Sequence, residues 1–127
     1  KFYFLHLVRN PAVAARSYMK SHGYKTYEKA CKKVLDDSIL ASTLEDYIDS
    51  DLYLRVYYED LLDNFDITIE NVNSWLGLET DPGWLSHIQK TLNKNDSETD
   101  MGDLNTAKEI VLTADTKNIF KRYFESI

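Results

Sequence analysis

Cysteine, glycine, proline and long apolar runs are all scarce in this sequence of 127 residues. The single cysteine, Cys31, cannot form a disulfide within the chain, so cysteine usage neither indicates nor excludes an oxidising compartment. With only 4 Gly and 2 Pro beside 43% hydrophobic residues, the composition is that of a folded domain and excludes a disordered one. No apolar run approaches the length of a membrane span. We therefore expect one globular domain, with no membrane contact from this segment.

Basic residues are too few to suggest a nucleic-acid partner. Lys and Arg total 15 against 21 Asp and Glu, which gives a net charge of -6. Such a charge repels a phosphate backbone unless the basic residues gather on one face, and the sequence shows no such gathering. The three His and Cys31 are scattered, and no carboxylates have the spacing of a metal loop. The sequence predicts neither a nucleic-acid partner nor a metal site.

The opening segment KFYFLHLVRN is a strand signal that begins at Lys1 without a basic leader or a cleavage site. Its nearly unbroken apolar run, Phe2 to Val8, is typical of a strand buried on both faces of a parallel sheet. A strand that starts at the first residue suggests a sequence cut from something longer. We expect Lys1 to be an artificial start.

A turn and a helix follow this strand directly. Asn10 suits the helix N-cap, Pro11 suits its first turn, and Gly23 can end it. Arg9 thus comes at the carboxyl end of the strand, where open α/β sheets bind their ligands. A helix amino terminus offers N–H groups, and an Arg offers a fork of donors that matches phosphate oxygens. This segment therefore predicts an anion site at Arg9.

Ser17 lies on the face of this helix that points back toward Arg9. It follows Asn10 by seven residues, or about two turns, and helical side chains lean toward the amino terminus. Its hydroxyl could therefore reach an anion held by Arg9. The alternative is that Arg9 forms a salt bridge with a nearby carboxylate and that Ser17 is an ordinary surface hydroxyl.

The rest of the chain alternates helical and extended patterns. DLYLRVYYEDLL reads as a second strand, with Leu54, Val56 and Tyr58 on one side. Strands separated by helices predict a parallel α/β sheet with right-handed crossovers, and two strands are too few for a complete sheet. We expect the missing strands upstream. A further helix is expected from about Tyr27, with Leu44, Tyr47 and Ile48 extending it. A helix over Asn64–Leu76 and a short one from Asp81 should come next, followed by a surface loop over Asn93–Thr106. The chain should end in a helix that buries Ile119, Phe120, Tyr123, Phe124 and Ile127.

Two segments resemble the sulfotransferase family. HLVRNPAVAARSYMKS is similar to the family's 3′-phosphate-binding segment, in which an Arg ends a strand and a Ser follows eight residues later, as Arg9 and Ser17 do. LRVYYEDLLDNFDITIENVNSWLGL resembles its strand, its Tyr-Glu-Asp motif and the next helix. The resemblance spans roughly Phe2 to Ile88, and its opening is most similar to the Golgi carbohydrate sulfotransferases.

The resemblance implies transfer of a sulfuryl group from 3′-phosphoadenosine 5′-phosphosulfate (PAPS) to a hydroxyl, with a glycan as the expected acceptor. It implies a three-layer α/β fold like that of P-loop kinases, with parallel strands and flanking helices. Arg9 and Ser17 would hold the 3′-phosphate, and Tyr58 would lie near the adenine or, equally, pack in the core. Residues 1–127 would be the C-terminal part of one sulfotransferase domain, without its N-terminal donor loop and inactive alone.

Several features leave other interpretations open. Asn10 and Ala12 replace a commoner Asp and a frequent basic residue, and NDSETDMGDLNTAKE is acidic where the family usually has an Arg-containing segment that contacts the nucleotide. The alternatives are a catalytically silent sulfotransferase-like binding module and another nucleotide-dependent kinase-like enzyme.

The expected cell compartment follows from the resemblance. The resemblance implies the lumenal side of the Golgi membrane, with the cytoplasm as second choice, and leaves open an anchor elsewhere in the full protein. A sequon at Asn95-Asp96-Ser97 agrees with the secretory pathway. The sequence assigns no catalytic residue.

Overall fold

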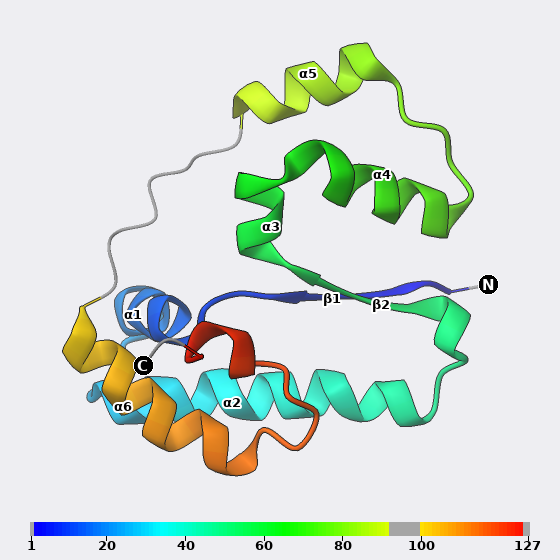
Figure 1. Ribbon diagram of the computed structural model, residues 1–127. Helices are drawn as coiled ribbons and strands as arrows, with labels where there is room; N and C mark the ends of the chain where they lie inside the picture. The colour runs from blue at the N-terminus through cyan, green and yellow to red at the C-terminus, as the bar shows by residue number, and fades with distance from the viewer. Residues whose placement is uncertain (1, 92–99, 126–127) are drawn as a thin grey trace. The chain divides into compact units, whose positions relative to one another are not determined.

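The structure is a computed structural model that describes residues 2–91 and 100–125. The chain divides into two compact units, and each is described by itself. The sheet unit comprises Lys1–Val8 and Ile48–Asp96, and the helical unit comprises Arg9–Tyr47 and Ser97–Ile127. Each unit thus joins stretches of chain that are far apart in the sequence (Figure 1).

The sheet unit contains two parallel strands, which confirms the expected α/β class with parallel strands. Strand β1 (Phe4–Val8) pairs with β2 (Tyr53–Tyr57) in a continuous register from Phe4 opposite Tyr53 to Val8 opposite Tyr57. Side chains alternate along each strand, so His6 and its partner Arg55 share one face of the sheet and Leu7 and Val56 share the other. Most of the described chain is helical.

Helix α4 (Phe65–Leu76) lies along the face that carries Leu7 and Val56. It follows β2 and the short helix α3 (Tyr58–Asp63), and Trp75 near its end contacts residues that come shortly before each strand. The Trp75 ring meets Tyr3 edge-on at 5.2 Å, and its Nε1 donates to the carbonyl of Asp51 at 2.8 Å. The helix therefore runs back along the sheet toward the start of the strands. Helix α5 (Pro82–Thr91) comes next and buries no residue fully.

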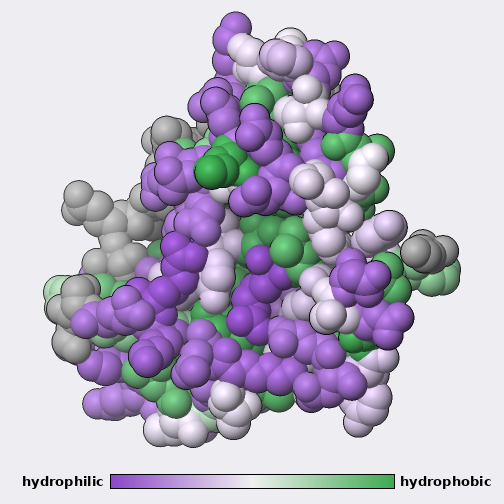
Figure 2. Space-filling model, turned by 45° about the vertical axis from the view of Figure 1, so that its right-hand side comes forward, coloured by the Kyte–Doolittle hydropathy of each residue, from purple (hydrophilic) through white to green (hydrophobic). Residues whose placement is uncertain are grey.

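Strand β1 is less buried than its sequence predicts. Leu5 and Leu7 are 45% and 50% exposed, and only His6 and Val8 are buried. The prediction of burial on both faces is therefore wrong for this chain, because a sheet of two strands gives β1 too few neighbours to cover its apolar side chains. Figure 2 shows hydrophobic side chains reaching a mostly hydrophilic surface.

Three helices that meet through small side chains form the helical unit. They are α1 (Pro11–His22), α2 (Tyr27–Thr43) and α6 (Met101–Val111), and all three pairs are in contact. The four alanines at their contacts are completely buried, which lets the backbones approach closely. These residues are Ala12, Ala15, Ala30 and Ala107.

The ends of α1 confirm the sequence prediction. Asn10 is the N-cap, and its side-chain oxygen accepts a hydrogen bond from the backbone N–H of Ala12 at 3.0 Å. Gly23 ends the helix in the left-handed conformation with φ 67°. Gly77 ends α4 in the same way with φ 74°. Both glycines occupy backbone conformations that other residues adopt only with strain.

The C-terminal part of the chain differs from the prediction in two ways. Helix α6 occupies part of the expected loop Asn93–Thr106, of which residues 93–99 lie outside the described part of the chain. The expected terminal helix is only a short 3-10 helix, Lys121–Tyr123. Ile119, Phe120 and Phe124 are buried as expected, whereas Tyr123 is only half-buried. Ile127 also lies outside the described residues.

Two hydrogen-bonding side chains explain the shape of this C-terminal segment. The carboxylate of Asp115 accepts the N–H groups of Ile119 and Phe120 at 2.7 and 2.8 Å, which closes a turn in place of a helix. Lys117 Nζ donates to the carbonyl of Ser42 at 2.6 Å and to Asp46 at 3.0 Å. Lys117 thus caps the end of α2 with a cation, the sign that a helix carboxyl terminus favours.

The region after α2 is only partly helical. Leu44 lies in a 3-10 helix, Leu44–Asp46, whereas Tyr47 is 87% exposed and Ile48 is outside any helix. The expected helical extension therefore ends early. Among the described helices, none is both long and apolar enough to cross a membrane.

Candidate functional site

Arg9 lies between the first strand and the first long helix. It directly follows β1, and α1 begins two residues later at Pro11. Arg9 is half-buried and takes part in interactions within the chain. The predicted order of strand, Arg and capped helix is thus present, and the anion-binding role of Arg9 remains a prediction.

The amino terminus of α1 offers an anion fewer backbone donors than the sequence suggested. Pro11 has no N–H, and the N–H of Ala12 is donated to Asn10 Oδ1. The N–H of Ala14 is donated to the carbonyl of Asn10 at 2.9 Å, as in an ordinary helix. An anion at this end of α1 would therefore depend more on side chains such as Arg9 and less on main-chain N–H groups.

Ser17 lies on an exposed side of α1, in the same unit as Arg9. Seven residues separate it from Asn10, which places it about 10 Å along the helix axis. A phosphate held by both residues would therefore lie over the first two turns of α1. Ser17 is accessible for such a role, and the role itself remains a prediction.

The residue before Ser17 forms an ion pair that the sequence did not reveal. Arg16 donates from Nε and Nη2 to the two carboxylate oxygens of Asp103, at 2.6 and 2.7 Å. Its guanidinium also lies over the ring of Tyr27, 4.5 Å from the centroid. The hydrogen bond to Asp103 raises the pKa of Arg16. Arg16 therefore joins α1 to the beginnings of α2 and α6.

Tyr58 lies at the start of a helix and not at the end of the strand. Strand β2 ends at Tyr57, and α3 begins with Tyr58, which is half-buried. The expected alternation that placed Tyr58 beside Leu54 and Val56 is therefore wrong at its last position. Tyr58 belongs to the sheet unit, whereas Arg9 and Ser17 belong to the helical unit. Its contact with an adenine remains a prediction.

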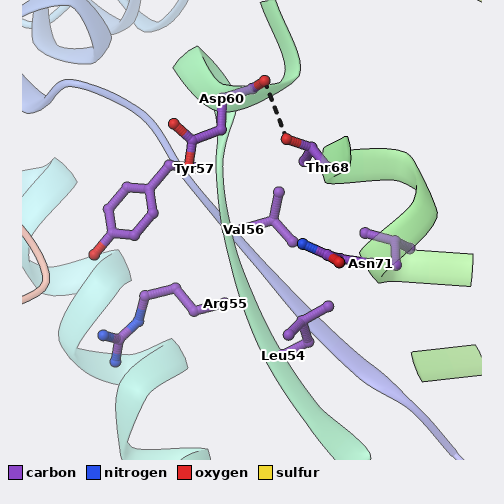
Figure 3. Close-up of a pocket in the computed structure, with 8 residues that line it drawn as sticks. Leu54, Arg55, Val56, Tyr57, Asp60, Thr68 and Asn71 are labelled. Atoms are coloured by element: carbon purple, nitrogen blue, oxygen red, sulfur yellow. Dashed lines mark hydrogen bonds between the residues drawn. The ribbon is translucent and has the colours of Figure 1, made fainter. Parts of the chain in front are cut away.

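A small cavity lies beside β2, α3 and α4. Its volume is about 140 Å³, similar to that of a cavity that holds one benzene molecule. Figure 3 shows Arg55 and Tyr57 on one side of the strand, and Leu54 and Val56 on the other, facing Asn71. Thr68 closes the upper wall by donating to the carbonyl of Asp60 at 3.1 Å. The cavity is too small for a whole nucleotide.

Two acidic residues of the C-terminal segment have structural partners. Asp103 pairs with Arg16 and its side chain is only 14% exposed. Asp100 is the N-cap of α6 and accepts from the N–H of Gly102 at 2.6 Å. The acidic character of this segment was the reason to consider an impaired donor site. That reason is weaker because these two carboxylates stabilise α6.

Two further reactive side chains, His6 and Cys31, have structural surroundings. His6 is buried, and its Nδ1 lies 2.7 Å from Tyr53 Oη on the neighbouring strand. Cys31 is fully buried, and this burial raises the pKa of its thiol to about 11. Within the described parts of the chain, no group of three or more His, Cys, Asp and Glu residues could hold a metal ion.

A family profile matches the part of the chain that contains Arg9, Ser17 and Tyr58. The profile described as "Sulfotransferase family" matches residues 2–82, which contain β1, α1, α2, β2, α3 and α4. No curated protein matches the chain.

A solved structure shows the same fold. The sulfotransferase domain of the olefin synthase from Synechococcus PCC 7002 is 19% identical and superposes with a TM-score of 0.55 over 84% of this chain. The match covers 48% of that domain, so the chain spans about half of its length. At this identity the likeness shows a shared fold. Because the family profile covers well over half of the sequence, the chain belongs to the sulfotransferase family.

Proposed function

We propose that the full protein transfers a sulfuryl group from PAPS to a hydroxyl, and that Arg9 and Ser17 hold the 3′-phosphate of this donor. The observation that carries the proposal is the order of β1, Arg9 and the capped helix α1, with Ser17 eight residues after Arg9. This segment lies within the region matched by the family profile. The position is the one at which open α/β sheets bind ligands.

The proposed reaction moves one group between two oxygens. The acceptor oxygen attacks the sulfur, the bond from sulfur to the 5′-phosphate oxygen breaks, and adenosine 3′,5′-bisphosphate leaves. As in phosphoryl transfer, positioning and charge neutralisation do most of the work. This chain contributes by fixing the 3′ end of the donor, so that its other end has one orientation. The base that accepts the acceptor's proton is not assigned to any residue here.

The donor site can be tested by replacing Arg9. In the full-length protein, Arg9→Ala should weaken binding of adenosine 3′,5′-bisphosphate by roughly 10- to 100-fold, because a charge-assisted pair of hydrogen bonds is lost. Ser17→Ala should weaken it by only about two- to tenfold. Isothermal titration calorimetry measures both effects. Lys20→Ala is the matched control, since it removes an exposed positive charge from the same helix.

The same titration separates the proposal from its alternatives. The proposal requires that adenosine 3′,5′-bisphosphate binds more tightly than adenosine 5′-phosphate, and that Arg9→Ala removes this preference. Preference for ATP would favour another kinase-like enzyme. A wild-type protein that binds no nucleotide would favour a catalytically silent binding module. Equal effects of Arg9→Ala and Lys20→Ala would remove Arg9 from the site.

We also propose that Tyr58 contacts the adenine, because it occupies the first position of the Tyr-Glu-Asp motif. An aromatic face gains about 1 kcal/mol by stacking on another ring. Tyr58→Leu should therefore weaken nucleotide binding by about fivefold, whereas Tyr58→Phe should keep most of the affinity. An unchanged affinity in the Leu variant would indicate that Tyr58 only packs within its own unit.

We propose further that the acceptor is a carbohydrate and that the protein is located in the Golgi. Both rest on the resemblance of HLVRNPAVAARS to the Golgi carbohydrate sulfotransferases. Transfer of labelled sulfate from PAPS to a panel of glycans and small phenols tests the acceptor class. Immunofluorescence of the full-length protein with a Golgi marker tests the location, and a cytoplasmic signal would support the second choice.

A further inference from the structure

The pair Arg16–Asp103 connects the helix of the proposed donor site to the last long helix of the described chain. Arg16 is the residue directly before Ser17 on α1, and Asp103 lies in the first turn of α6. The two side chains meet through two hydrogen bonds, at 2.6 and 2.7 Å. This bidentate geometry fixes both distance and orientation, which a single contact between charges does not.

The residues around the pair hold the Arg16 side chain in one conformation. The Asp103 side chain is 14% exposed, so its carboxylate depends on a partner. Tyr27 lies against the guanidinium, and its hydroxyl donates to the carbonyl of Ala12 at 2.8 Å. Tyr27 is thereby tied to the first turn of α1, the turn that follows Arg9. Movement of Arg16 would therefore disturb both the Asp103 pair and the contact with Tyr27.

The pair also leaves Arg16 less available as a second ligand for the donor. Two of its donor groups are occupied by Asp103, and the charge of the pair is zero. A third group, Nη1, lies 3.8 Å from the sulfur of Met19. The structure therefore gives Arg16 a role between helices, although it is adjacent to Ser17.

We infer that Arg16 is a positioning residue that couples the donor site on α1 to the docking of α6 through Asp103. The inference rests on the proposed function, because it takes Ser17 as a donor contact. If α6 keeps α1 in the orientation that presents Ser17, a bound donor must in turn favour the docked state of α6. Such coupling between two sites is reciprocal.

Hydrogen exchange in the full-length protein tests the coupling. In the wild type, saturating adenosine 3′,5′-bisphosphate should slow amide exchange in α6. In Arg16→Met, α6 should exchange faster without nucleotide and should no longer respond to it, and nucleotide affinity should fall by about fivefold. Asp103→Asn should behave in the same way. Arg16→Lys, which keeps the charge but loses the bidentate fork, should restore only part of the response.

The control and the contrary results separate this inference from the proposed function. Lys20→Met changes an exposed residue of the same helix and should leave α6 exchange unchanged. If Arg16→Met binds nucleotide and α6 responds as in the wild type, the coupling is overturned while the proposed function stands. If the wild type binds no nucleotide, both are overturned. Faster exchange throughout the helical unit of Arg16→Met, with unchanged affinity, would also overturn the coupling, because it indicates a purely structural role.

Discussion

The environment of Cys31 makes a potential nucleophile unreactive. The side chain is completely buried in α2, and burial raises the pKa of its thiol to about 11. Tyr27, one turn earlier on the same helix, lies close enough to interact with this thiol, and burial raises the pKa of Tyr27 as well. Both groups therefore stay protonated at neutral pH. The thiol contributes packing to the helical unit and no chemistry.

This environment predicts slow alkylation of Cys31. The fraction of thiolate at pH 8 should be about a hundredfold lower than in an ordinary thiol, because the pKa rises from 9.0 to about 11. Iodoacetamide should therefore label Cys31 slowly in the folded protein and quickly in denaturant, as measured by peptide mass spectrometry. Raising the pH toward 11 should speed the labelling. Equal rates with and without denaturant at pH 8 would contradict the buried position.

Residues of the candidate site differ in how far the sequence could predict them. Arg9 and Ser17 belong to one local pattern, so their spacing alone placed them on the turn and the helix. The pair of Arg16 and Asp103 had no such signal, because 87 residues separate its members. The sequence predicted Asn10 as the N-cap of α1, and a capping side chain uses an N–H group that an anion would otherwise bind, which here is that of Ala12.

At the scale of elements, Gly77 permits the turn that ends α4. Its φ of 74° lies in the left-handed region, and no atom lies within 4 Å of the position where a Cβ would be. A substitution there would therefore meet backbone strain alone, without a steric clash. Leu78, the next residue, donates its N–H to the carbonyl of Asn73 at 2.7 Å, which completes the helix end.

Replacing Gly77 by Ala should lower the free energy of unfolding by about 1 kcal/mol, the cost of the left-handed conformation. Urea unfolding followed by circular dichroism measures the change. Gly83→Ala is the comparison, since Gly83 has no positive φ; its Cβ would lie 3.3 Å from Asp81 Oδ1, so that side chain must shift slightly, and the substitution should lower stability less than Gly77→Ala. A Gly77→Ala protein as stable as the wild type would mean that the end of α4 rearranges without cost.

The sequence predicted two elements poorly: the start of α6 and the segment near the C-terminus, where single polar side chains bind backbone N–H groups. The boundary drawn at Thr106 divided α6, whose buried residues Ala107 and Val111 come later. Near the C-terminus, the apolar spacing of Ile119, Phe120 and Phe124 fits a helix, and their burial was predicted correctly. The carboxylate of Asp115 takes the N–H groups needed for that helix, and periodicity does not reveal such a competing bond.

At the scale of the whole molecule, apolar surface is concentrated on β1 and the residues before it. Phe2 is 90% exposed, and Phe4, Leu5 and Leu7 are 39%, 45% and 50% exposed. Two strands alone make a marginal sheet, and an uncovered apolar strand is a site of association. This polypeptide should therefore be less soluble by itself than its composition suggests.

Expression of residues 1–127 alone tests this expectation. The polypeptide should bind the dye 1-anilinonaphthalene-8-sulfonate and should associate at micromolar concentrations, as measured by fluorescence and analytical ultracentrifugation. The double variant Leu5→Lys, Leu7→Lys should bind less dye and associate less, because like charges repel along the strand. A monomeric wild-type polypeptide that binds no dye would contradict the exposure of β1.

The division into two units determines the order in which the chain can assemble during synthesis. The helical unit is discontinuous, since the stretch 48–96 of the sheet unit lies between its two parts. On the ribosome, β1 and β2 can pair soon after residue 57 emerges, and α1 and α2 can pack on each other early, whereas the contacts with α6 and the bond from Lys117 form only after those residues emerge. The helix that carries Ser17 is therefore synthesised well before α6, and the part of its surface that α6 covers stays exposed until then.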